Sequence, residues 1–345
     1  MADKMIGMTY RHHLKTACRR MAAFKFVLMA LYLTAISACS TTSPSPQAFQ
    51  IGLFGDTGYS SFEKQALPGL MAEMNREALA FVVHDGDFKS GSSLCSDAAF
   101  NEALNFFQAS AHPLIYVPGD NDWTDCHRAA AGRFDPLERL AKLREMFFVG
   151  NASLGQRTLQ LERQSDQASQ EPTWAAYREN VRWVQGGVLF VGLNLPGSDN
   201  NFDGTKRGSG PSAEYLARLP VTRAWVAQSF ELARTQNLVG LMLIIQANPE
   251  IEAFNQGQGH EAYRAFLTQL REETQRFAKP VVLVHGDSHR QQINQALKDA
   301  QGKTLPNFTR VETHGSPFMG WTRVTIDPQS KAVFSFEPRA YSPSR

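Results

Sequence analysis

The sequence predicts an α/β fold, because short apolar runs alternate with segments of helical periodicity from residue 49 onward. The apolar runs have the length and turn boundaries of buried strands. They are FQIGLF (49–54), AFVVH (80–84), PLIYV (113–117), VLFVGLN (188–194), LMLIIQ (241–246) and VVLVHG (281–286). Helical spacing of apolar residues occurs over 62–79 and 98–109, and Asp135-Pro136 supplies a cap and a first-turn proline for another helix. Residues 321–326 and 332–338 are separated only by the turn 327–331, which predicts a terminal hairpin.

The composition is that of a globular protein without a nucleic-acid-binding surface. Of 345 residues, 43% are hydrophobic and 20% are charged, which allows one large domain or two ordinary ones. Residues 1–38 contain six of the 35 basic residues and one of the 33 acidic residues, which leaves 29 basic and 32 acidic residues. This slightly negative remainder gives no electrostatic support for nucleic-acid binding. The polar stretch 161–174 is interpreted as a surface excursion within one domain.

The N-terminal segment has the pattern of an export signal. A basic stretch precedes an apolar run that is too short after Lys25 to span a bilayer comfortably. The run ends in Ile36-Ser37-Ala38-Cys39, which resembles a bacterial lipobox. This resemblance implies cleavage after residue 38, lipid attachment at Cys39 and an exported lipoprotein of the outer or inner membrane, facing the periplasm or the cell surface. An ordinary cleaved signal or a signal anchor is the alternative. Residues 39–48 then form a Ser/Pro tether and 49–345 the folded domain.

Two cysteines remain for the folded domain once Cys18 is removed and Cys39 is acylated. In an oxidising compartment, pairing of Cys95 with Cys126 is the expectation, and two separate buried thiols are the alternative. The chain-entropy model gives such a bridge about 3–4 kcal/mol of stabilisation, mainly through the unfolded state.

Acidic residues follow four of the predicted strands, and a Gly-Asp pair occurs in each case. The polar residues at these strand ends are Asp56, Asp85, Asp87, Asp120, Asp122, Asp287 and His289. A single Gly-Asp is typical of a turn or a helix cap. Four of them at the carboxyl ends of strands predict a common crevice, because ligands of open α/β sheets bind there.

Carboxylates that converge in this way need positive charge, because each raises the pKa of its neighbours and buried anions are costly. Asp56, Asp87, Asp120 and Asp287 with His289 form an oxygen-rich set that suits Mn²⁺ or Mg²⁺, and the imidazole also allows Zn²⁺ or iron. Carboxylates on four loops can hold two divalent ions about 3.5–4 Å apart.

The ordered blocks GDTG, GDFKS, GDND, IIQANP and HGDSH resemble those of the calcineurin-like metallophosphoesterases, over about residues 50–326. The resemblance implies a four-layer α/β/β/α sandwich in which two mixed sheets are flanked by helices. It also implies a hydrolase that cleaves a phosphate mono- or diester through a metal-bound hydroxide. The ligands it implies are Asp56, Asp87 and His289 for the first ion and Asp87, Asp120, Gln246 and Asp287 for the second.

Several positions depart from the family pattern. Gly58 and Ser90 stand where family members carry a histidine and a tyrosine, and Gln246 and Asp287 each replace a histidine ligand. Asp120 replaces the asparagine of the same block. More oxygen and fewer nitrogen ligands favour Mn²⁺ or Mg²⁺ over Zn²⁺.

The predicted catalytic residues are Asn121 and His285. Asn121 replaces the histidine that assists the leaving group, and its amide can contact a phosphate oxygen but cannot supply a proton. His285, with His84 and His127 as alternatives, is the candidate proton donor, although a lone histidine is more often a structural residue. Lys89 and Arg128 are further candidates for offsetting phosphate charge, Asp122 is expected to hold its own loop, and a Cys95–Cys126 bridge would join two ligand loops.

Two other function classes compete with the phosphoesterase interpretation. A catalytically silent domain that binds a ligand or partner in the same crevice stays possible because histidines are replaced. A serine hydrolase is disfavoured, because no Gly-x-Ser-x-Gly elbow follows a strand. No nucleotide or sugar signature identifies the substrate.

Overall fold

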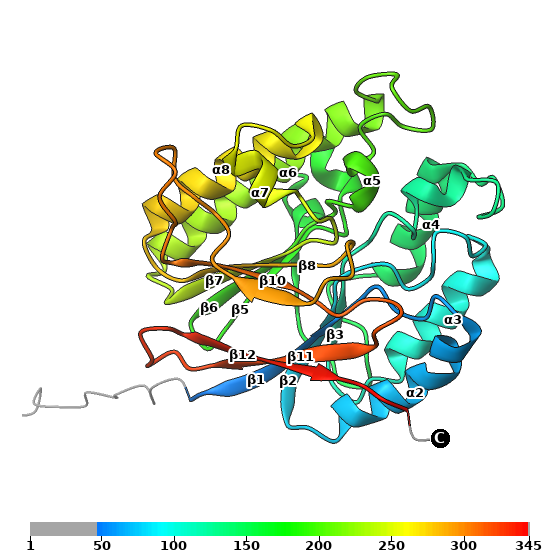
Figure 1. The fold of residues 1–345 in the computed structure, drawn as a ribbon, viewed down its shortest axis with the longest axis horizontal. Helices are drawn as coiled ribbons and strands as arrows, with labels where there is room; N and C mark the ends of the chain where they lie inside the picture. Colours follow the sequence, from blue (N-terminus) through cyan, green and yellow to red (C-terminus); the bar gives the residue numbers. More distant parts are fainter. Residues whose placement is uncertain (1–46, 344–345) are drawn as a thin grey trace, which may run out of the picture. The chain divides into compact units, whose positions relative to one another are not determined.

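A computed structural model describes residues 47–343 of the chain (Figure 1). The predicted signal segment 1–38, the lipid attachment site Cys39 and most of the tether lie outside the described residues. Among the described helices, none combines the length and the apolar character that crossing a membrane requires.

The first sheet has five strands in the order β12-β11-β1-β2-β3. They are β1 (Phe49–Phe54), β2 (Leu79–His84), β3 (Leu114–Tyr116), β11 (Gly320–Ile326) and β12 (Phe334–Ala340). β1, β2 and β3 run parallel, whereas β11 is antiparallel to both β1 and β12. The predicted terminal hairpin is therefore confirmed as an antiparallel pair at the edge of this sheet.

The second sheet has seven strands in the order β4-β5-β6-β7-β8-β10-β9. They are β4 (Glu162–Arg163), β5 (Val181–Gln185), β6 (Val188–Gly192), β7 (Gly240–Ile244), β8 (Val281–His285), β9 (Gln292–Asn294) and β10 (Phe308–Glu312). β6, β7, β8 and β10 are parallel, and the remaining pairs are antiparallel. Sequence reasoning missed β4, β5, β9 and β10, because these strands are short or contain charged residues and so lack an apolar run.

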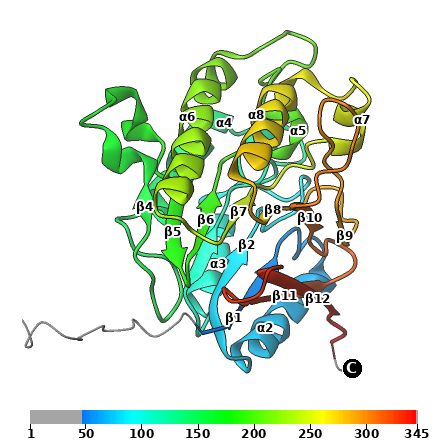
Figure 2. The same ribbon diagram turned by 90° about the vertical axis from the view of Figure 1, so that its left-hand side faces the viewer.

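Helices cover the outer face of each sheet. The first sheet carries α2 (Ser61–Asn75), α3 (Asp97–Gln108) and α4 (Pro136–Phe147), and the second carries α6 (Ala213–Thr235) and α8 (Glu261–Phe277), which lie side by side in Figure 2. Shorter elements are α5 (Gly197–Asn200), α7 (Ile251–Asn255), η1 (Thr124–His127), η2 (Gln164–Gln167) and η3 (Pro172–Ala176). Asp135 caps α4 as predicted, since its Oδ1 accepts from the two backbone N–H groups of Leu137 and Glu138.

The apolar core lies in three layers, and β8 shows why. Val282 and Val284 pack between the two sheets, whereas Val281 and Leu283 pack under the helices of the second sheet. A strand that is buried on both faces is apolar throughout, which explains why such strands appear in the sequence as uninterrupted apolar runs. The architecture is thus two mixed sheets flanked by helices, in the order α/β/β/α, as predicted.

Candidate functional site

Four carboxylates meet at the carboxyl ends of the strands, and we call them the acidic cluster: Asp56, Asp87, Asp120 and Asp287. They lie in the loops after β1, β2, β3 and β8. The glycines before two of them show how close the loops come. A Cβ atom on Gly119 would lie 2.0 Å from Oδ1 of Asp87, and one on Gly286 would lie 1.8 Å from Oδ2 of Asp56. The predicted convergence is therefore present, and these glycines make room for the acid of another loop.

The backbone at the site is in an unfavourable conformation. Asp56, Asp87, Asp287 and His289 have φ angles of 44°, 59°, 73° and 59°, in the left-handed region that residues other than glycine seldom adopt. Such conformations cost about 1–3 kcal/mol each and persist only where the surrounding structure enforces them. One enforcing contact is the hydrogen bond from the backbone N–H of Asp56 to the Gly86 carbonyl, at 3.0 Å.

The electrostatics of the cluster favour a cation. Burial raises the pKa of Asp56, Asp87 and Asp287, and the charge of Asp120 acts in the same direction on each. Among residues 47–343, His289 is the only basic side chain within ion-pair distance of the cluster, with its Nε2 atom 3.5 Å from Oδ1 of Asp56. Most of the negative charge is thus uncompensated by the described side chains.

Tyr59 lies inside the site, and sequence reasoning missed it. Its hydroxyl donates to Oδ2 of Asp87 at 2.9 Å and lies 3.3 Å from Oδ1 of Asp56. Asn121 donates to the same Asp87 oxygen through Nδ2 at 2.6 Å and to Oδ1 through its backbone N–H at 3.0 Å. Burial raises the pKa of Tyr59 well above its usual value, so the phenol keeps its proton. No pattern in the sequence separates this tyrosine from a packing residue.

Ser198 joins two acids on the other side of the cluster. Its Oγ atom lies 2.8 Å from Oδ2 of Asp120 and 3.0 Å from Oδ2 of Asp125, and Arg128 contacts both Asp125 at 2.7 Å and Ser198 at 3.2 Å. Burial raises the pKa of Asp125 to about 7, with the charge of Asp120 acting in the same direction and that of Arg128 against it. Ser198 lies in α5, after β6, where no Gly-Asp pair marks the strand end, so sequence reasoning missed it.

A polar pocket of about 380 Å³ opens beside these groups. Asp125, Arg128 and Ser198 line the side near the acidic cluster, while His127 and Arg207 are among the other lining residues. The pocket therefore offers hydrogen-bonding and charged groups next to the carboxylates, as a polar substrate requires.

Asp122 holds its loop, as predicted. Its carboxylate accepts from the backbone N–H groups of Asp87 at 2.9 Å, Phe88 at 3.1 Å and Gly119 at 2.9 Å, and from the Tyr116 hydroxyl at 2.8 Å. One side chain thus fixes the loops after β2 and β3 together.

The predicted bridge between Cys95 and Cys126 is also confirmed. The two Cα atoms are 5.6 Å apart, and the sulfur atoms lie 3.7 Å and 3.9 Å from the backbone carbonyl of Asn121. The disulfide therefore packs against the loop that carries Asp120 and Asn121.

The two remaining predicted ligands, His289 and Gln246, lie next to the acidic cluster and differ in which of their atoms are hydrogen-bonded. His289 pairs its Nδ1 with the Ser316 carbonyl at 2.7 Å, which leaves Nε2 facing Asp56, as in a histidine oriented for a metal. Gln246 is fully buried, but its Oε1 accepts from the backbone N–H of Gly197 at 2.6 Å and of Asp120 at 3.4 Å. The side-chain oxygen of Gln246 is therefore already used by two backbone donors.

The structure does not bring His285 to the acidic cluster. Its ring is buried, and Nδ1 pairs with the backbone carbonyl of Gly286 at 3.0 Å. Burial lowers the pKa of His285 to about 4, although the negative charge of Glu312 acts to raise it, and burial lowers the pKa of His84 to about 3. Neither ring is protonated near neutral pH, and His127 instead lines the polar pocket.

The comparison with solved structures concerns the fold. A purple acid phosphatase from yellow lupin (Lupinus luteus) matches 85% of this chain with a TM-score of 0.50 at 12% identity. This chain has the metallophosphoesterase fold. The match covers 52% of the lupin chain, so the present chain spans about half the length of that enzyme. A dimetal phosphatase from Danio rerio matches over 85% of this chain and 99% of its own, with a TM-score of 0.44 at 13% identity. No family model and no curated protein matches the sequence.

The metallophosphoesterase fold raises the question of whether these residues suit divalent metals. In chemical type they do, since the acidic cluster is buried, oxygen-rich and short of positive charge, and Oδ1 of Asp120 has no partner among the described residues. Their positions do not form a metal site, because no group of three or more His, Cys, Asp or Glu side chains within residues 47–343 is arranged to hold an ion. Tyr59, Asn121 and Ser198 hydrogen-bond the carboxylates instead, so coordination requires those contacts to be exchanged.

Proposed function

We propose that this chain is a metal-dependent phosphoesterase that hydrolyses a phosphate mono- or diester. The observation that carries the proposal is the convergence of four carboxylates, short of counter-charge, at the strand ends of a metallophosphoesterase fold. Mn²⁺ or Mg²⁺ suits this oxygen-rich set best, and two ions are expected.

The cation-binding residues would be the acidic cluster and His289. Divalent cations held there would supply positive charge for the transferring phosphoryl group and activate water. Asp87 is central, because its carboxylate lies between Asn121 and Tyr59 and its charge acts together with those of the other three acids.

The groups that meet the substrate line the polar pocket. Arg128 has a side chain that is 49% exposed, and its guanidinium can bind a phosphate oxygen while it pairs with Asp125. Asp125, rather than the predicted His285, takes the role of proton donor, because its carboxyl lines the pocket and accepts a hydrogen bond from Ser198. A proton on Asp125 can pass to a leaving oxygen bound in that pocket.

The test is metal analysis of the purified protein, followed by hydrolysis of an aryl phosphate monoester and diester with Mn²⁺, Mg²⁺ or Zn²⁺. We expect bound metal and cation-dependent turnover. The variant Asp87→Asn should lose both metal and activity, because it removes a charge at the centre of the cluster.

Asp85→Asn is the matched control. Asp85 is another buried acid of the same loop, but its Oδ2 accepts from the Thr313 hydroxyl at 2.9 Å, and it is not one of the proposed cation-binding residues. We expect this variant to keep metal and turnover. Absence of bound metal and of hydrolysis with every ion would instead support a catalytically silent ligand-binding domain.

We further propose, from the sequence pattern at residues 36–39, that the protein is exported and lipid-anchored at Cys39. The variant Cys39→Ala should lose its membrane association in fractionation. If a cleaved Cys39→Ala protein still fractionates with membranes, the lipid anchor is wrong.

A further inference from the structure

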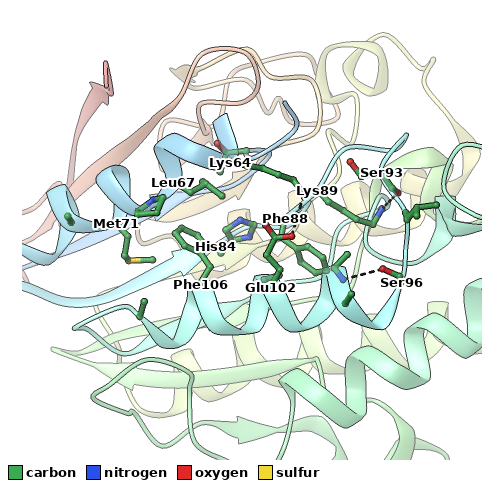
Figure 3. Close-up of a pocket in the computed structure, with 18 of the residues that line it drawn as sticks. Lys64, Leu67, Met71, His84, Phe88, Lys89, Ser93, Ser96, Glu102 and Phe106 are labelled. Carbon is green, nitrogen blue, oxygen red and sulfur yellow. Dashed lines mark hydrogen bonds and ion pairs between the residues drawn. The ribbon is translucent and has the colours of Figure 1, made fainter. Parts of the chain in front are cut away.

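A second cavity, of about 730 Å³, lies between α2 and α3 on the outer face of the first sheet (Figure 3). Leu67 and Met71 face it from α2, Phe106 faces it from α3, and His84 lies on its floor. Packed protein interiors leave few voids larger than a water molecule. The volume and the mainly apolar lining are those of small-molecule sites, which span about 300–1,000 Å³.

The cavity persists because two contacts hold the helices and the side chains of α3 that face it are small. At the C-terminal ends of the helices, Nδ2 of Asn75 donates to the carbonyl that follows α3 at 3.3 Å. Nearer their N-terminal ends, Lys64 on α2 and Glu102 on α3 form an ion pair at 3.5 Å, and both side chains line the cavity (Figure 3). α3 presents the methyl groups of Ala99 and Ala103 to the cavity, and these are too small to fill it.

One end of the cavity carries a buried cation. Lys89 is 2% exposed and lies with Ser93 at the opposite end from Met71 (Figure 3). Its Nζ atom donates to the backbone carbonyls of Ser90 at 3.3 Å and Ser93 at 3.2 Å. Asp122, Asp87, Asp125 and Asp120 act on it electrostatically, but no carboxylate of residues 47–343 lies within ion-pair distance of Nζ.

A buried ammonium group is costly unless an anion pairs with it. An ammonium group has three donors, and two carbonyls use two of them. The cavity therefore has an apolar part and a buried positive end at Lys89, while the exposed side chains of Lys64 and Glu102 also line it and neutralise each other.

We propose that this cavity binds a fatty-acid-like anion, with its aliphatic chain along Leu67, Met71 and Phe106 and its carboxylate on Lys89. The apolar walls select against short anions, which gain nothing from them, and the ammonium selects against uncharged amphiphiles. The proposal does not depend on phosphoesterase activity, because neither the acidic cluster nor the polar pocket lines this cavity.

The test is calorimetric titration of the purified protein with dodecanoate below its micellar concentration, with dodecanol and acetate as the comparison ligands. We expect saturable one-to-one binding of dodecanoate, binding of dodecanol weaker by at least about tenfold because it lacks the charge, and no binding of acetate. Lys89→Met should make the affinities for the acid and the alcohol about equal, whereas Lys142→Met, on α4 and outside the lining of the cavity, should keep the preference for the acid.

Ala99→Phe should fill the space between the helices and abolish binding of both dodecyl ligands, with its folding checked by circular dichroism. Equal affinities of the unmodified protein for acid and alcohol, or no saturable binding, would overturn the proposal. So would unchanged binding in a folded Ala99→Phe variant. The ratio of the two affinities is measured within each variant, so a partly folded preparation does not imitate the expected result.

Discussion

Replacing Asp125 by Asn tests the proton donor. Asn has nearly the same shape and keeps an oxygen for Ser198, but its amide cannot give up a proton. At pH 7 a carboxyl whose pKa is about 7 holds its proton in about half of the molecules. General acid catalysis typically contributes about 10²–10⁴-fold, and a hundredfold loss corresponds to about 2.7 kcal/mol in the barrier.

The assay compares two leaving groups in the Mn²⁺-loaded protein. The glycerol of glycerol phosphate leaves as an alkoxide that needs a proton, so Asp125→Asn should lower turnover of this substrate by about a hundredfold. Para-nitrophenyl phosphate releases para-nitrophenolate, which is a stable anion, so this substrate should be cleaved almost as fast as before. Because the acid form is the active one, turnover of glycerol phosphate should fall as pH rises through about 7 in the unmodified protein, and this dependence should disappear in the variant.

Equal losses for both substrates would refute the role, because they would show that Asp125 only positions Arg128 or Ser198. An unchanged pH dependence in Asp125→Asn would refute it as well. Asp199→Asn is the matched control, since Asp199 lines the same pocket with a side chain that is 47% exposed. This control should keep the pH dependence.

Three further outcomes are expected. Metal-free protein should lose stability as pH rises from about 4 to about 7, because folded Asp56, Asp87, Asp287 and Asp125 keep protons that unfolded carboxylates release; unfolding midpoints with EDTA measure the loss, and saturating Mn²⁺ should remove the part that comes from Asp56, Asp87 and Asp287. Replacing Cys95 and Cys126 together by Ala should lower the free energy of unfolding by about 3–4 kcal/mol in denaturant titrations, and an unchanged midpoint would contradict the contribution of the bridge. Tyr59→Phe should tighten Mn²⁺ binding in calorimetry, because it removes a hydroxyl donor from Asp87, whereas weaker binding would show that the hydroxyl is itself a ligand.

The predictable part of the site consists of residues tied to a strand end. Asp56, Asp87, Asp120 and Asp287 follow apolar runs, and parallel strands carry such residues to one edge of a sheet. Asp122 is predicted to hold its loop, because a turn needs one acid whose side chain bonds the backbone. The four groups that donate to its carboxylate bear this out.

The residues that could not be predicted depend on side-chain direction or on contacts between distant loops. His285 ends β8 next to a ligand loop, yet alternation along the strand turns it under the helices, as with Val281 and Leu283. Tyr59 faces the cluster only because the loops after β1 and β2 lie together.

The sequence by itself determined the α/β class, six of the buried strands, the terminal hairpin and the strand-end acids, because these follow from local periodicity and turn chemistry. Tertiary structure alone decided what surrounds each acid. It placed Ser198 and Asp125 beside Asp120, and it left a hollow between α2 and α3 with Lys89 at one end. Such features depend on the distance between segments that the chain brings together only on folding, so no local pattern records them.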